Sequence, residues 1–89
     1  MHVAFVVHMV KGADADTLIS EETKRDTQAV VMSLDDAGKM GFSTSGITAK
    51  PGQEVNIIIV AKRDAPWVRR QVEAHDHVAG FHEVDVNLA

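Results

Sequence analysis

The chain has 89 residues, which is enough for one domain, and its 45% hydrophobic and 25% charged residues are typical of a folded globular protein. It contains no cysteine, which excludes disulfides and thiolate chemistry and fits a reducing, cytoplasmic compartment. Its formal net charge of −4 argues against binding to phosphate backbones. We therefore expect one domain over residues 1–89 with no nucleic-acid partner.

The first predicted element is a strand over residues 2–10. The run is rich in valine and phenylalanine, has no helical periodicity and is ended by Lys11 and Gly12. It has no basic leader and is too short to span a bilayer, so we expect no membrane partner.

A helix is predicted over residues 13–37. Asp14 and Asp16 are candidate N-caps, and Gly38 is a candidate stop. One face of this helix would carry the residues that recur at steps of three and four: Ile19, Thr23, Thr27, Val30, Leu34 and Ala37. The apolar run over residues 29–32 fits a strand equally well, and the pattern leaves that alternative open.

A hairpin is predicted next. Residues 42–48 are β-branched and alternating, the sequence Lys50-Pro51-Gly52 has turn chemistry, and residues 55–61 form an apolar strand. The second strand of this hairpin is apolar on both faces.

The last two predicted elements are a helix over 64–80 and a strand over 81–88. Asp64 and Pro66 favour a helix start, and Gly80 favours its end. The final strand alternates, with His82, Val84, Val86 and Leu88 on one side and Phe81, Glu83, Asp85 and Asn87 on the other.

This order of elements predicts an α+β fold of the ferredoxin-like βαββαβ type, with a four-stranded antiparallel sheet and two helices on one face. The opposite face would expose aliphatic side chains from residues 57–60. A second copy of the chain is the expected cover, which predicts a homo-oligomer, a dimer or a multiple of dimers.

The sequence resembles the dimeric α/β-barrel superfamily, and within it the muconolactone isomerases and the YciI-like proteins. The resemblance rests on the segments 5–9, 34–39, 45–47 and 84–88. It implies a small oligomer that binds a compact organic acid or lactone at the sheet without a cofactor, either as a binding protein or as an isomerase-like enzyme that transfers protons.

Three residues are candidates for acid and base catalysis. His8 ends an apolar strand, where an imidazole could exchange a proton with a bound ligand, or could simply bond to solvent or backbone. Glu83 and Asp85 share one side of the last strand, which points them either into a pocket or to solvent.

Three further residues are candidate ligand contacts. Asn56 is a polar residue within an aliphatic strand and needs a partner if buried. Ser45 could bond a carboxylate, and Trp67 could cap a pocket, although each could also serve the fold alone.

The histidines over residues 75–82 do not predict a metal site, because His75 and His77 would diverge on a helix and no fixed third ligand follows. Two alternative functions remain. One is a regulatory trimer resembling the nitrogen-regulatory signal proteins, and the other is a structural subunit that uses the sheet face as an interface.

Overall fold

The computed structural model describes residues 1–86, so Asn87 and Leu88 of the last predicted strand lie outside the described residues. The elements are β1 (His2–Val10), η1 (Ala15–Thr17), α1 (Glu21–Thr27), β2 (Val30–Ser33), α2 (Leu34–Lys39), β3 (Gln53–Ala61), η2 (Lys62–Asp64), α3 (Ala65–Ala74) and β4 (Val78–Val86). The strands form one antiparallel sheet in the order β2-β3-β1-β4. This is the predicted ferredoxin-like order, with α2 added between β2 and β3.

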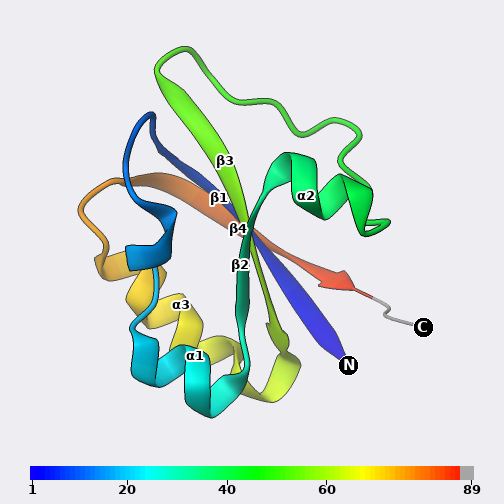
Figure 1. The fold of residues 1–89 in the computed structure, drawn as a ribbon, viewed down its shortest axis with the longest axis vertical. Helices are drawn as coiled ribbons and strands as arrows, with labels where there is room; N and C mark the ends of the chain where they lie inside the picture. Colours follow the sequence, from blue (N-terminus) through cyan, green and yellow to red (C-terminus); the bar gives the residue numbers. More distant parts are fainter. Residues whose placement is uncertain (87–89) are drawn as a thin grey trace.

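One face of the sheet is covered by α1 and α3, which lie on the same side in Figure 1. Phe5 on β1 lies opposite Ile58 on β3 and Glu83 on β4, so these side chains share that face. Phe5, Ile58 and Val68 of α3 are fully buried in one cluster. This side therefore holds the main hydrophobic core.

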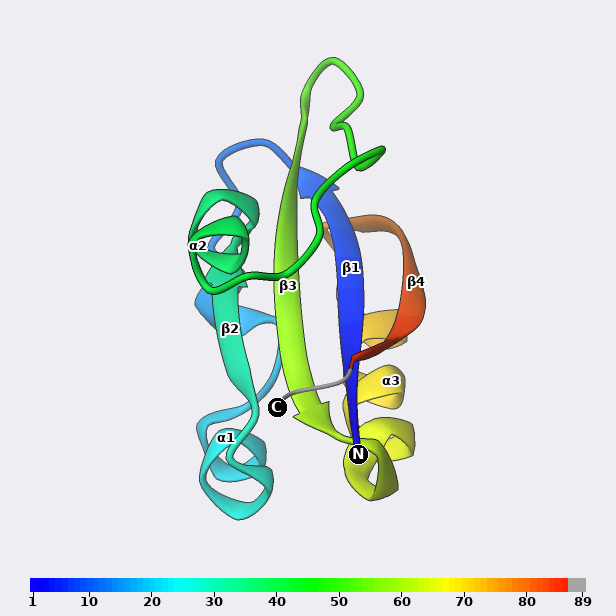
Figure 2. The same ribbon diagram turned by 90° about the vertical axis from the view of Figure 1, so that its right-hand side faces the viewer.

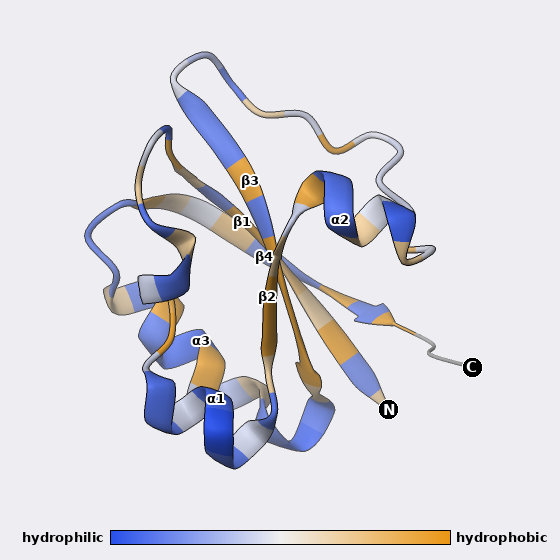
Figure 3. Cartoon of the chain, in the orientation of Figure 1, coloured by the Kyte–Doolittle hydropathy of each residue, from blue (hydrophilic) through white to orange (hydrophobic). Residues whose placement is uncertain are grey.

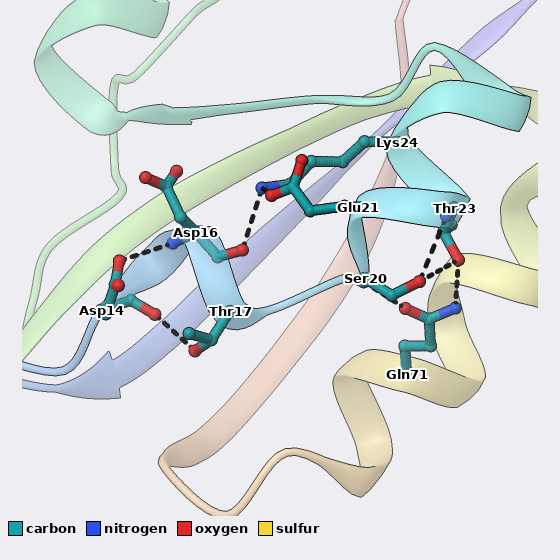
Figure 4. A network of polar contacts seen from close by, with 8 residues as sticks. All are labelled: Asp14, Asp16, Thr17, Ser20, Glu21, Thr23, Lys24 and Gln71. Atoms are coloured by element: carbon teal, nitrogen blue, oxygen red, sulfur yellow. Dashed lines mark hydrogen bonds and ion pairs between the residues drawn. The ribbon is translucent and has the colours of Figure 1, made fainter.

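A polar network joins α1 to α3 (Figure 4). Ser20 caps α1 by accepting the Thr23 N–H at 3.1 Å. Gln71 of α3 accepts the Ser20 N–H at 2.8 Å and donates to the Thr23 hydroxyl. These bonds fix α1 against α3 although the two segments are about fifty residues apart in the sequence.

On the opposite face, α2 lies over the edge strand β2 and the loop that follows it crosses β3, as Figure 2 shows. Ala4, Val6 and Ile57 of the sheet are buried there against Ala37 of α2. Figure 3 shows the apolar stretches of β1 and β3 that need this cover. The face is thus closed at its centre, and hollows remain at both ends.

The continuous helix predicted over residues 13–37 is wrong: the range holds the short helices η1 and α1, the strand β2 and the first residues of α2. Gln28 adopts a left-handed conformation, with φ 58°, and ends α1. Residues 30–33 then pair with β3 as strand β2. Since Val30 and Val31 are β-branched, they pack well on a pleated surface, and the strand alternative for this run is the one that the structure adopts.

The strand predicted over residues 42–48 is also wrong. Gly41 and Gly46 have φ of 93° and 82°, and the Ile47 N–H bonds to the Thr44 carbonyl in a tight turn. Phe42 and Ile47 instead pack onto the sheet beside α2. The strand that pairs with the outer edge of β3 is β2.

The helix predicted over residues 64–80 ends six residues early, at Ala74. The ring of His75 accepts the backbone N–H of His77 through Nδ1 at 3.1 Å, which stabilises a turn after the helix. Val78 to Gly80 then begin β4, which starts before the predicted residue 81. The predicted alternation over 81–86 is confirmed by the pairing with β1.

Candidate functional site

A half-open hollow of about 470 Å³ lies at the His2 end of the sheet, on the face that α2 partly covers. Its apolar lining comes from β2, β3 and the residue after α2, namely Val30, Met32, Ile59 and Met40, together with Met1. Its polar rim contains His2, Thr27, Gln28 and Arg63. A volume of this size lies within the range of about 300–1,000 Å³ that small-molecule sites occupy.

The charge of this hollow is opposite to that of the chain. Arg63 is the only side chain with a permanent charge among its described lining residues, and none of them is acidic. Its nearest ionic neighbour is Asp64, 3.7 Å from Nε, and 87% of its side chain is exposed. The guanidinium therefore keeps its remaining N–H groups accessible to a bound carboxylate.

The structure places His8 on the same sheet face as this hollow but at the other end of β1. His8 lies opposite Gly80, while Val6 lies opposite His82, so the two imidazoles are neighbours on that face. Their ring centroids are 6.3 Å apart. The sequence did not indicate this pairing, because it depends on the register between β1 and β4.

Glu83 and Asp85 share one side of β4, but that side faces α3 rather than His8. The Arg69 side chain donates to both carboxylate oxygens of Glu83, at 2.5 and 2.8 Å. These hydrogen bonds hold the pKa of Glu83 below its usual value and raise the pKa of Arg69. An Asp85 carboxylate oxygen lies 3.6 Å from the Lys62 ammonium nitrogen. Both carboxylates therefore form ion pairs with basic side chains of the same chain.

The three predicted ligand contacts do not meet at one place. Asn56 is buried on the helix side of the sheet, opposite Val7, and its amide nitrogen lies 3.4 Å from the sulfur of Met9. Ser45 is exposed in the turn after α2. Trp67 is 36% exposed on α3.

The ring of His75 and the backbone of His77 form hydrogen bonds within the protein. The Nδ1 of His75 accepts the His77 N–H, which leaves Nε2–H to donate to the Thr17 hydroxyl at 2.8 Å. Thr17 in turn donates to the Asp14 carbonyl. Within residues 1–86, no group of three or more histidine, cysteine or acidic side chains is placed to hold a metal ion.

Comparisons with family models, curated proteins and solved structures found no match to this chain. The ferredoxin-like order therefore stands on the structure itself, and the relation to muconolactone isomerases and YciI-like proteins stays a prediction. None of the helices within residues 1–86 is long and apolar enough to cross a membrane.

The sequence analysis missed several of the residues that line the hollow at the His2 end. Met32 fell within the helix predicted over residues 13–37, and Arg63 was not among the candidate residues, although both line the hollow. The available signal was the strand alternative for residues 29–32, which would have placed Val30 and Met32 beside Ile59 and Ile57 on the open sheet face.

Proposed function

We propose that this chain is a small-molecule binding protein of the dimeric α/β-barrel type, whose ligand is a compact apolar carboxylic acid held in the hollow at the His2 end of the sheet. The observation that supports this proposal is an apolar hollow of about 470 Å³ with an arginine at its rim and no acidic side chain among its described lining residues. The chain as a whole has 13 acidic and 9 basic residues. The positive charge of this hollow is therefore opposite in sign to the net charge of the chain.

The apolar body of the ligand would lie on Val30, Met32 and Ile59. Methionine side chains are unbranched and polarizable, so they adapt to flat or irregular ligands. The Arg63 guanidinium would hold the carboxylate through two parallel hydrogen bonds. His2, a further lining residue, is the titratable group through which a proton transfer on such a ligand would run.

The test compares phenylacetate with its neutral isostere phenylacetamide by isothermal titration calorimetry. We expect tighter binding of the acid, and we expect Arg63→Gln to weaken acid binding roughly tenfold while it changes amide binding little. Arg70→Gln is the matched control, because Arg70 is exposed on α3 and does not line the hollow. Equal affinity for acid and amide in the native chain would rule out the carboxylate site.

The alternative function, an oligomer subunit that uses this face as an interface, is favoured by one observation. Val30 is 51% and Met40 is 70% exposed, and both flank the hollow. A second copy packed face to face would bury them and would close the hollow. Ligand binding and dimerisation are therefore compatible on this face.

Dimerisation is tested by sedimentation velocity of Val30→Asp. We expect the native chain to sediment as a dimer and Val30→Asp to shift it towards the monomer, because a carboxylate in an apolar interface is left unpaired. Ala74→Asp, an exposed change at the end of α3, should leave the dimer intact. A native chain that is monomeric at every concentration would contradict the interface and would leave the ligand site open to solvent.

A further inference from the structure

A second hollow, of about 210 Å³, lies at the other end of the same sheet face. It is lined by His8 of β1, Gly80 and His82 of β4, Gln53 at the start of β3 and Lys50 in the preceding turn. It shares no lining residue with the larger hollow. Its polar side chains come from three separate segments that the sheet register brings together.

Gly80 creates the space in this hollow. It lies directly opposite His8 in the β1–β4 ladder, and a Cβ added to Gly80 would meet no atom within 4 Å. The φ angle of Gly80 is not positive, so the backbone conformation at this position does not require glycine. Any other residue at this position would project a side chain between the two strands' polar groups.

The polar groups of the hollow are available. Within residues 1–86, the side chains of His8, His82, Gln53 and Lys50 take part in no hydrogen bond or ion pair with the protein. His8 and His82 differ in this respect from His75, whose two ring nitrogens both have hydrogen-bond partners. Each neutral imidazole can donate one N–H, the amide can donate two, and the ammonium can donate three.

The electrostatics favour an anion over a metal cation. Lys50 is the charged residue among the described lining residues, and none of them is a carboxylate. A tetrahedral zinc ion with two histidine ligands needs ring centroids about 5 Å apart, given Zn–N distances of about 2.0–2.1 Å. The observed separation is 6.3 Å, which is too long for that chelate. It leaves room for an oxygen of a bound anion at each ring.

We infer that this hollow binds a tetrahedral oxyanion, namely phosphate or the phosphate group of a small ester. The Lys50 ammonium supplies the charge, and the imidazole N–H groups of His8 and His82 with the Gln53 amide orient the oxygens. This site is independent of the carboxylate site proposed above, because the two hollows lie at opposite ends of β1 and have separate cations, Arg63 and Lys50.

The test is a titration of the ¹⁵N-labelled chain with sodium phosphate at constant ionic strength, followed by amide chemical shifts. We expect saturable shifts at residues 8, 53, 80 and 82. Gly80→Val fills the hollow without removing a donor, and Lys50→Ala removes the charge from an exposed turn that the fold does not need. Each should weaken phosphate binding at least tenfold, and His77→Ala and Lys39→Ala should leave it unchanged.

Two further titrations separate the alternatives. Phenyl phosphate that saturates the same amides would identify an ester as an accepted ligand, and exclusion of phenyl phosphate with retention of phosphate would identify the free ion. Either result supports the site. Phosphate shifts that persist in both Gly80→Val and Lys50→Ala would overturn it. Saturation of these amides by Zn²⁺ but not by phosphate would also overturn it, in favour of a metal site.

Discussion

Replacing Phe5 with alanine is expected to lower the free energy of unfolding by about 3–5 kcal/mol. Phe5 lies at the middle of the central strand β1, its side chain is 0% exposed, and its ring centroid is 6.0 Å from that of Phe81. The substitution removes a large buried ring and leaves a cavity that strands on both sides prevent from collapsing. A domain of this size has a total stability of about 5–15 kcal/mol, so the loss is a large fraction of it.

The measurement is urea unfolding followed by circular dichroism and by the fluorescence of Trp67, the single tryptophan. Phe42→Ala is the matched control, because Phe42 is only half-buried, at the margin of the cluster beside α2. We expect it to cost about 1 kcal/mol. If both substitutions cost the same, the main core does not lie between the sheet and α1 with α3.

The two central strands were predictable because burial on both faces leaves a strong local signal. The run from His2 to Val10 coincides with β1, and the predicted strand 55–61 lies within β3. Such strands are near-continuous apolar runs that turn residues delimit. The order of strands and the placement of α1 and α3 on one face followed from these two strands and from the right-handed crossover rule.

The edge strand β2 was not predictable with the same means. It has four residues, and its apolar run fits helical and extended spacing equally. Its identity as a strand is decided by pairing with Ile57 to Ile59, which lie about 25 residues further along the chain. The misassignment then displaced the predicted hairpin to residues 42–48, where Gly46 within the segment and Gly41 just before it have positive φ and the chain turns instead of extending.

The candidate sites depend on facts that a single sequence does not contain. Alternation along β4 predicted that Glu83 and Asp85 share a side, and their contacts with Arg69 and Lys62 confirm it. Which of the two sides His8 occupies depends on the register between β1 and β4, which shifts between His8 and Met9. The hollow at the His2 end is lined by β2 and by Met40, which follows α2, so it could not be derived without these elements.

Replacing Ala37 with aspartate is expected to destabilise the chain by about 3 kcal/mol or more. Ala37 is 0% exposed and packs with Ala4, Val6 and Ile57 beneath α2. A carboxylate at this position would be buried against aliphatic side chains without a partner, and unpaired buried charges are among the most costly substitutions. Ala74→Asp makes the same substitution at an exposed position at the end of α3, outside this face, and we expect it to cost less than about 1 kcal/mol.

Urea unfolding gives the magnitude, and amide hydrogen exchange shows where the loss falls. If α2 is the cover of this sheet face, Ala37→Asp should abolish protection in α2 while β1 and β3 keep theirs under native conditions, because the helix side of the sheet retains its own core. A tolerated Ala37→Asp would mean that α2 does not hold this face. Val6 and Ile57 would then need a second copy of the chain as their cover, and the hollow beside Met40 would be a property of the dimer alone.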